Sequence, residues 1–108
     1  MQCITMEFDI QRVVWDKWNE EHISKHGLTR PEVDHVCYGR PIKYKESYKD
    51  RVLVIGRGLD DRLITVVVGV VPDEPNGVFY PFSARPSDRK ERAFYANARR
   101  IGSSPSDG

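Results

Sequence analysis

The chain has 108 residues, of which 39 % are hydrophobic and 31 % are charged, with a formal net charge of +1. This length suits one domain with one hydrophobic core and excludes a second domain of ordinary size. The longest apolar run, residues 63–71, is far shorter than the about 20 residues that a membrane-spanning helix requires, so we expect no membrane segment.

The first residues and the two cysteines bear on the cellular compartment. Glu7 and Asp9 stand where a signal peptide would be apolar, so we expect a cytoplasmic protein. Cys3 and Cys37 are isolated, with neither a Cys-x-x-Cys pair nor a zinc-type spacing. The sequence therefore predicts no disulfide framework, no metal site and no other cofactor.

The N-terminal part predicts a strand and then a helix. Residues 6–15 alternate apolar and polar side chains, which favours a first strand. Asp16 is placed to cap a helix over residues 17–26, because its carboxylate can accept from the free amides of the first turn. Gly27 suits the left-handed conformation that ends a helix.

A second short helix is predicted directly after the first. Thr29 and Glu32 have the Thr-x-x-Glu spacing of a capping box. Gly39, followed by Pro41, stops the helix. We therefore expect two short helices joined by a tight turn.

Four strands are expected after residue 41, where the hydrophobic period changes from 3.6 to 2. Short hairpin loops between them make the sheet antiparallel. Pro81 cannot donate to a ladder, so it predicts an edge or a bulge late in the last strand. The expected strands are residues 42–47, 51–57, 63–71 and 78–84.

A final helix is expected over residues 88–100, with Ser87 as its N-cap. The predicted fold class is α+β: two short N-terminal helices, an antiparallel four-stranded sheet that an N-terminal strand can extend, and a C-terminal helix packed on the sheet. Residues 1–101 form this single domain. The polar residues 102–108 are expected to be a disordered tail.

Charge is distributed unevenly along the chain. Residues 1–34 hold 4 Lys/Arg against 7 Asp/Glu, whereas residues 35–71 hold 7 against 4 and residues 78–101 hold 6 against 2. A basic surface on a nearly neutral protein favours an anionic partner, such as nucleic acid or an acidic protein. Solvated charge without a function is the alternative interpretation.

Two histidines, His22 and His26, lie one turn apart on the first predicted helix. That spacing can bind zinc, but the Glu of a His-Glu-x-x-His motif is absent because Ile23 follows His22. A capping or partly buried structural role is the competing interpretation, since His26 lies near a helix C-terminus.

Arginines recur on the predicted strands and hairpins. Arg51 and Arg57 are six residues apart, so they share one face of a strand if no bulge intervenes. Together with Arg62 and Arg85 they are candidates for binding phosphate, because a guanidinium group binds two phosphate oxygens and keeps its charge. Alternatively, these arginines only keep an exposed sheet face soluble.

A helix N-terminus is expected within a few residues of Arg85. Such an end, beside an arginine, suits an anion. Arg89 and Arg92 could equally pair with Asp88 and Glu91 as ordinary surface charge.

These features occur in an order that resembles one known family. The chain has Trp-x-x-x-Asn-x-x-His-Ile-x-Lys-His-Gly, then Thr-x-x-Glu-Val, then Arg-Val-Leu-Val-Ile-Gly and Asp-Arg-Leu-Ile-x-Val, and finally Ser-Ala-Arg followed by Glu-Arg-x-x-Tyr. This order, over residues 15–95, resembles the BrnT family of bacterial toxins.

The resemblance implies a fold similar to the RelE-type ribonuclease toxins, with helices packed on an antiparallel sheet. It implies a toxin of a type II toxin–antitoxin pair, a metal-independent endoribonuclease that cleaves RNA through attack by the 2′-hydroxyl and arrests translation. The implied partners are the RNA substrate and a DNA-binding antitoxin encoded alongside. A homo-oligomer, or a heterotetramer with the antitoxin, is also compatible with this interpretation.

The resemblance maps the family's strand arginines onto Arg51, Arg62 and Arg85, its Lys-His onto Lys25 and His26, and its late Glu-Arg-Tyr onto Glu91, Arg92 and Tyr95. Arg57 and Arg89 are added from the charge pattern alone. The predicted catalytic residues are Arg51, Arg62, Arg85, His26 and Tyr95. The predicted RNA-binding residues are Lys25, Arg57, Arg89 and Arg92. The chain departs from the family pattern at Pro81, which interrupts an apolar strand, and in the longer hairpin over residues 72–77.

Two other functions remain open at this point. The same basic sheet face could hold RNA or an acidic protein partner without cutting anything. A metal-dependent hydrolase would require zinc held by His22 and His26.

Overall fold

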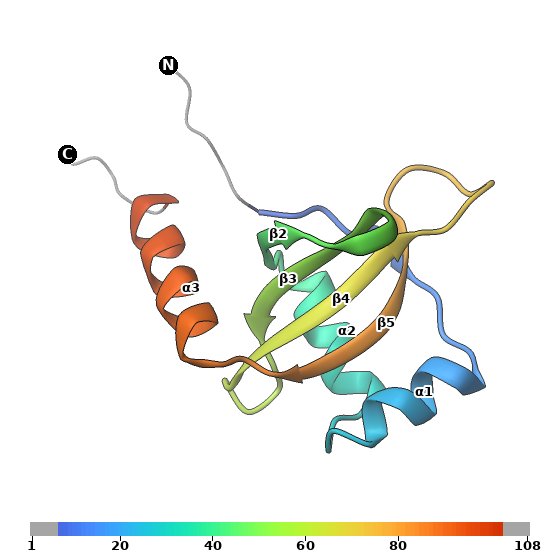
Figure 1. Cartoon of the computed structure of the whole chain (residues 1–108), viewed down its shortest axis with the longest axis horizontal. Helices are drawn as coiled ribbons and strands as arrows, with labels where there is room; N and C mark the ends of the chain where they lie inside the picture. The colour runs from blue at the N-terminus through green and yellow to red at the C-terminus, as the bar shows by residue number, and fades with distance from the viewer. Residues whose placement is uncertain (1–6, 103–108) are drawn as a thin grey trace.

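The computed structural model describes residues 7–102, which form a sheet with helices on both of its faces (Figure 1). The five strands are ordered β1-β5-β4-β3-β2, with β1 parallel to β5 and the other pairs antiparallel. The elements are β1 Arg12–Val13, α1 Lys17–Ser24, α2 Arg30–Tyr38, β2 Ile42–Glu46, the 3-10 turn η1 Tyr48–Asp50, β3 Arg51–Arg57, β4 Leu63–Val70, β5 Val78–Pro86 and α3 Arg89–Gly102.

The predicted fold class is wrong, because the sheet is five-stranded and mixed. The two short helices α1 and α2 lie between β1 and β2, whereas we expected them to precede an antiparallel four-stranded sheet. The added strand has only two residues, Arg12 and Val13, which pair with Val78 and Phe79. A two-residue strand carries no alternating pattern of its own, and its parallel partner is more than 60 positions away in the sequence.

The boundaries of α1 and α2 follow from their caps. Asp16 accepts a hydrogen bond from the Asn19 amide at 3.0 Å, and the Asn19 side chain accepts from the Asp16 amide at 2.9 Å. Gly27 follows the helix at φ +78°, a conformation that glycine adopts without strain. Thr29 caps α2 through the Glu32 amide, but the Glu32 carboxylate turns away from the cap to Arg62, so the expected capping box is half formed.

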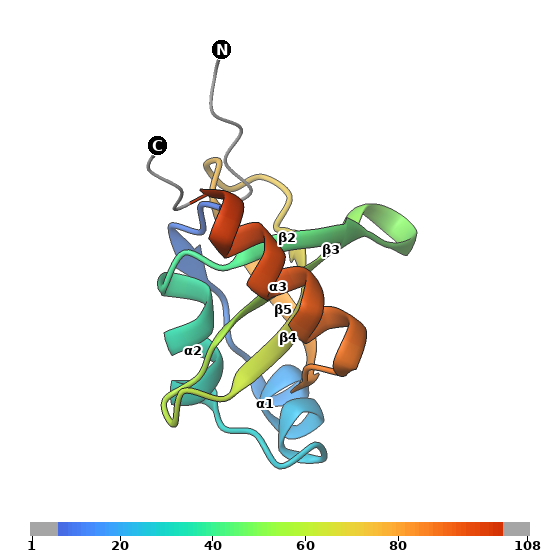
Figure 2. The same cartoon turned by 90° about the vertical axis from the view of Figure 1, so that its left-hand side faces the viewer.

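The two faces of the sheet are covered differently. The inner face, which carries Val54, packs against α1 and α2 through a core that includes Ile23 and Val36. The outer face carries Ile55, which is the neighbour of Val54 and therefore points the opposite way. Only one end of this outer face is covered, by α3 (Figure 2). The residues of that second cluster are Ile42, Ile55, Tyr95 and Ala98.

The start of α3 differs by one residue from the expectation. Asp88, in place of Ser87, caps the helix: its carboxylate accepts from the Glu91 amide at 2.8 Å, and Glu91 accepts from the Asp88 amide at 2.8 Å. This reciprocal pair is a capping box with an acidic N-cap.

Pro81 marks a bulge, one of the two outcomes expected of it. Val67 pairs with Ser83 and Val68 pairs with Pro81, so β5 has one residue more than β4 at this point. Because β5 lies between β1 and β4, Pro81 does not stand on an edge strand.

Two expectations concern the ends of the chain and the membrane. The predicted disordered tail, residues 102–108, lies outside the described residues except for Gly102, at which α3 ends. Within residues 7–102, every helix is too short or too polar to cross a bilayer.

The packing of α3 on the outer face predicts a specific stability loss. Replacing Ile55, which is fully buried, by alanine should lower the free energy of unfolding by about 2–4 kcal/mol, because it leaves a cavity beneath α3. Leu59→Ala, in the exposed β3–β4 loop, should change it by less than about 0.5 kcal/mol. Urea unfolding of both variants measures this, and equal losses would contradict the described packing.

Candidate functional site

Arg51 and Arg57 share the outer face of the sheet. The β3–β4 ladder runs from Arg51 to Arg57 without a register shift, so both side chains point to the side of Ile55. They stand at opposite ends of β3, and six residues of strand span roughly 20 Å. One phosphate group therefore cannot contact both.

Arg62 belongs to the opposite side of the molecule. It lies in the β3–β4 loop, and its guanidinium group is 3.2 Å from the Glu32 carboxylate of α2 and 3.7 Å from that of Asp60. The Glu32 side chain is only 10 % exposed. Removing Arg62 would leave this buried carboxylate without its ion-pair partner, so the geometry assigns Arg62 a structural contact.

Arg85 is bound to a buried carboxylate at the start of α3. Its two terminal nitrogens donate to the two oxygens of Glu91 at 2.7 and 2.6 Å. Glu91 also accepts from the Thr65 hydroxyl at 2.9 Å, and Ser87 lies 2.8 Å from that hydroxyl. Since the single Thr65 proton goes to Glu91, Ser87 is the donor in the second bond.

These contacts determine the ionisation of Glu91. Burial alone would raise its pKa, but the hydrogen bonds from Arg85, the Asp88 amide and Thr65 together hold the pKa below the ordinary value. Glu91 is therefore a carboxylate at neutral pH, and it joins β4, β5 and α3.

The three predicted catalytic arginines thus do not meet at one point. Arg62 contacts the helix on the inner face, Arg85 contacts the helix on the outer face, and Arg51 stands at the far end of that outer face. A grip of all three on one phosphodiester is incompatible with this geometry.

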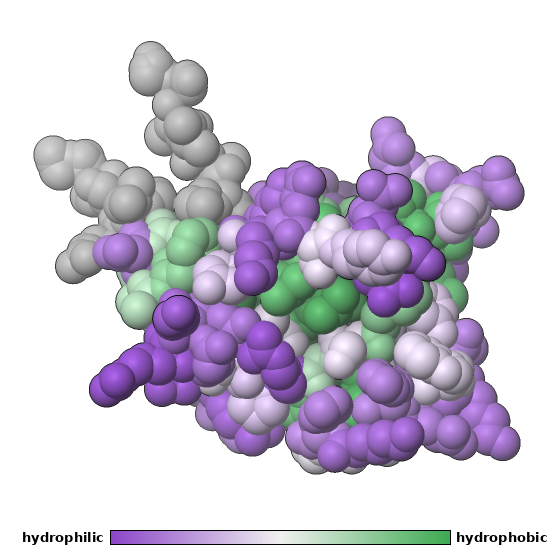
Figure 3. All heavy atoms as spheres, viewed as in Figure 1, coloured by the Kyte–Doolittle hydropathy of each residue, from purple (hydrophilic) through white to green (hydrophobic). Residues whose placement is uncertain are grey.

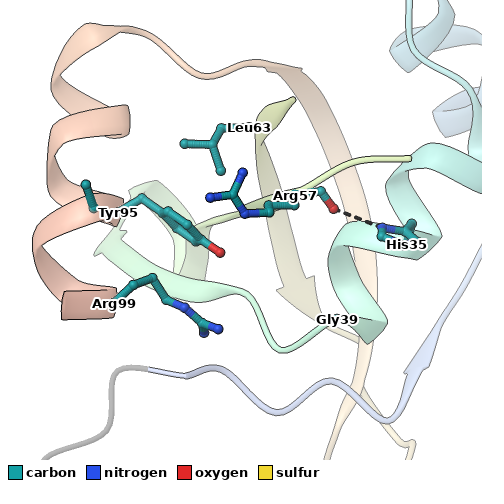
Figure 4. Close-up of a pocket in the computed structure, with 7 residues that line it drawn as sticks. His35, Gly39, Arg57, Leu63, Tyr95 and Arg99 are labelled. Atoms are coloured by element: carbon teal, nitrogen blue, oxygen red, sulfur yellow. Dashed lines mark hydrogen bonds between the residues drawn. The ribbon is translucent and has the colours of Figure 1, made fainter. Parts of the chain in front are cut away.

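A pocket of about 620 Å³ instead gathers other basic and aromatic side chains between α2, β3 and α3. Figure 4 shows Arg57, Tyr95 and Arg99 facing the same space, with His35 across from Tyr95. The Arg57 and Arg99 guanidinium groups lie 5.6 and 5.7 Å from the centre of the Tyr95 ring. We call this group of four residues the arginine–tyrosine pocket.

Two ion pairs of the pocket arginines involve more exposed carboxylates than the Glu91 partner of Arg85. Arg57 lies 3.3 Å from Asp61, whose side chain is 80 % exposed, and Arg99 lies 3.4 Å from Glu7 at the surface. Exposed ion pairs of this kind contribute at most about 1 kcal/mol. A phosphate can therefore compete with the exposed Asp61 carboxylate for Arg57.

The orientation of His35 follows from its partner. Its Nδ1 lies 3.0 Å from the backbone carbonyl oxygen of Arg57, as the dashed line in Figure 4 marks. A carbonyl oxygen only accepts, so Nδ1 carries the proton and, in the neutral ring, Nε2 keeps a free lone pair. The neutral ring can therefore accept a proton only at Nε2.

Four other predicted site residues lie apart from the pocket or at its margin. Lys25 and His26 are exposed at the end of α1, which Figure 1 shows well separated from α3. Arg89 and Arg92 are exposed in the first turns of α3, and Arg92 donates to the Ser87 carbonyl at 2.8 Å. Arg57 and Tyr95 are the predicted site residues that the structure brings together.

The sequence gives no signal for the other two pocket residues. His35 belongs to no motif, and its proximity to Arg57 depends on how α2 packs across the sheet. Arg99 is seven residues from Arg92 on α3, so the helical period alone places both on one side of that helix, without showing that a pocket faces it.

Two further observations concern the possible metal ligands and the one thiol among residues 7–102. No three His, Cys, Asp or Glu side chains of this range gather closely enough to hold a metal ion. The Cys37 thiol is buried in the core, which raises its pKa to about 12, so it does not supply a thiolate at neutral pH.

Comparison with known proteins adds no family assignment. No protein-family model matches the chain, and no curated protein matches it. The resemblance to BrnT toxins stays a prediction from the residues quoted above.

The buried Glu91 predicts how stability depends on pH. A carboxyl group whose pKa is lowered by folding stabilises the fold above its ordinary pKa, about 4.3, and this contribution is lost as the pH falls through the lowered value. Glu91→Gln should therefore lower the free energy of unfolding at pH 7 by about 1–3 kcal/mol, and this difference should shrink toward pH 3.

Urea unfolding between pH 3 and 7 measures this difference. The matched control is Glu46→Gln, which removes an exposed carboxylate paired with Lys43 and should have little effect at any pH. A Glu91→Gln difference that is the same at pH 3 and pH 7 would contradict the assigned ion pair.

Proposed function

We propose that the protein is the toxin of a bacterial toxin–antitoxin pair and a metal-independent endoribonuclease that cuts RNA in the arginine–tyrosine pocket. The observation that carries this proposal is the meeting of two guanidinium groups, a phenol and an oriented imidazole in one pocket. The volume of about 620 Å³ lies in the range of small-molecule sites and suits a nucleotide.

RNA supplies its own nucleophile, so the site needs few catalytic groups. Attack by the 2′-hydroxyl on the adjacent phosphorus forms a 2′,3′-cyclic phosphate and expels the 5′-oxygen of the next nucleotide. In the proposed site His35 Nε2 removes the 2′-hydroxyl proton, and the Tyr95 hydroxyl protonates the leaving oxygen. Arg57 and Arg99 stabilise the charge that develops on the phosphate oxygens.

This assignment changes the residues proposed for catalysis. Arg57 and Tyr95 stay in the site, His35 and Arg99 join it, and Arg85 acts indirectly by fixing the start of α3. The cytoplasmic location, the arrest of translation and a DNA-binding antitoxin encoded alongside belong to the same proposal, through the resemblance to BrnT toxins.

A second candidate is a non-catalytic module that holds RNA, or an acidic protein, on the outer face. The observation that favours it is the commitment of Arg62 and Arg85 to buried carboxylates, which removes two of the three arginines that sequence reasoning placed in catalysis. Such a module would retain RNA in a salt-dependent manner without releasing shorter products.

Variants of the pocket distinguish the two functions. His35→Gln and Arg57→Ala should each lower the rate of RNA cleavage by about 100-fold or more, because each removes a group that acts in the transition state. Arg12→Ala removes an equally exposed arginine, paired with Glu74, and should leave the rate unchanged. The measurement is cleavage of a labelled RNA in EDTA, alongside growth of cells that express each protein.

Product ends provide a second readout. A 2′,3′-cyclic phosphate on the 5′ fragment is the product of the proposed attack. Full cleavage by His35→Gln and Arg57→Ala would show that the pocket is not the site of cleavage. RNA that the unaltered protein binds but leaves intact would favour the non-catalytic module.

A further inference from the structure

The outer face has a second recess at the end that α3 leaves open. It has a volume of about 530 Å³, and we call it the aromatic groove. Its lining residues are Trp18, Arg51, Val70, Val71, Pro72, Tyr80 and Phe82. Figure 3 looks onto this face and shows hydrophobic surface over strands β3 to β5, bordered by hydrophilic residues.

The centre of the groove is a stacked pair of an arginine and a phenylalanine. The Arg51 guanidinium carbon lies 3.7 Å from the centre of the Phe82 ring. Phe82 lies against Gly69, where an added Cβ would come within 2.7 Å of the ring, so glycine permits this close approach. Tyr80 continues the aromatic surface, with its ring centre 4.9 Å from that of Phe82.

A hydrogen bond holds the walls of the groove together. The Tyr80 hydroxyl donates to the Asp16 carboxylate at 2.8 Å, which connects β5 to the first turn of α1. Burial and this carboxylate raise the pKa of Tyr80 to about 12, so the donor stays protonated at neutral pH. Trp18, two residues after Asp16, is thereby positioned at the groove.

Exposure and charge indicate what the groove suits. Trp18 is 55 % exposed and Val70 is 63 % exposed, although both are apolar. Arg51 has no ion-pair partner among residues 7–102, and it is the only charged side chain in the described lining. The Asp16 carboxylate at the wall of the groove is engaged by Tyr80, and no carboxylate pairs with Arg51 among residues 7–102, so the aromatic faces and this cation complement an unpaired nucleobase and its phosphate.

We propose that the aromatic groove binds unpaired bases of the same single-stranded RNA that enters the arginine–tyrosine pocket. This inference rests on the proposed function and deepens it, because it predicts that the substrate must be single-stranded on one side of the cut. Strand β3 connects the two sites, with Arg51 at the groove and Arg57 at the pocket, roughly 20 Å apart along the outer face.

Trp18 provides a direct probe of this binding. The chain has two tryptophans, so Trp15→Phe leaves Trp18 as the only one. A 12-nucleotide single strand of 2′-O-methyl RNA serves as ligand, because its blocked 2′-oxygen cannot attack the phosphate. Adding it should quench Trp18 fluorescence with saturation, and a 12-base-pair duplex of the same sequence should bind at least tenfold more weakly.

Two variants in the Trp15→Phe background test the groove itself. Phe82→Leu should weaken binding of the single strand on the order of tenfold, since the ring that holds Arg51 at the groove and continues its aromatic surface is lost. Arg51→Ala should do the same, whereas Arg12→Ala removes the same charge elsewhere and should change the affinity less than twofold. Circular dichroism melting identifies a variant that fails to fold. If Phe82→Leu fails to fold, the comparison of Arg51→Ala with Arg12→Ala tests the groove.

Several results would overturn the proposal. These are equal affinities for single strand and duplex, unchanged affinity in both groove variants, or no quenching at saturating RNA. Trp18 fluorescence that changes with protein concentration alone would assign the groove to a second copy of the chain, which also excludes RNA as its occupant.

The outcome is separable from that of the proposed function. Groove binding of the 2′-O-methyl strand with no cleavage of natural RNA would retain the groove and reject the nuclease. Cleavage of natural RNA with unaltered binding by Phe82→Leu and Arg51→Ala would retain the nuclease and reject the groove.

Discussion

One buried carboxylate, Glu91, fixes the position of α3 and with it the geometry of the arginine–tyrosine pocket. It accepts hydrogen bonds from Arg85 on β5, Thr65 on β4 and the amide of Asp88, which caps α3. Because these partners belong to three elements, the first turn of α3 is held against the ends of two strands. The helix then crosses one end of the outer face, so that Tyr95 stands beside Arg57. Arg85, which the sequence predicts to be catalytic, is therefore part of an ion pair that supports a neighbouring pocket.

The position of α3 also divides the outer face into two regions with different chemistry. The covered end holds two guanidinium groups, a phenol and an imidazole, in the arginine–tyrosine pocket. The open end holds aromatic rings and Arg51, in the aromatic groove. A single strand of RNA offers the complementary parts, a phosphodiester for the first region and an unpaired base for the second. The inner face packs against α1 and α2 and forms the main hydrophobic core, which stabilises the fold.

Sequence reasoning succeeded where the cause was local. The strand over residues 51–57, the cap at Asp16 and the shared face of Arg51 and Arg57 depend on short-range periodicity and turn chemistry. It failed where the cause was a contact between distant segments. The parallel pairing of β1, the partner of Arg62 and the proximity of His35 to Arg57 all depend on packing across the sheet. The charge pattern predicted that Arg51, Arg57, Arg62 and Arg85 act together. In the structure, Arg62 and Arg85 pair with the buried carboxylates of Glu32 and Glu91, so they are not available to bind a phosphate.

The central claim is that RNA lies on the outer face, across both regions. Photochemical crosslinking of the unaltered protein to a single-stranded RNA that carries 4-thiouridine at every uridine, followed by peptide mass spectrometry, tests it most directly. The account predicts crosslinks in β5 near Phe82 and in α3 near Tyr95, which lie on that face. Crosslinks confined to the β3–β4 loop near Arg62, or to parts of α1 and α2 away from Trp18 and His35, would place the RNA on the other side of the sheet and contradict the account.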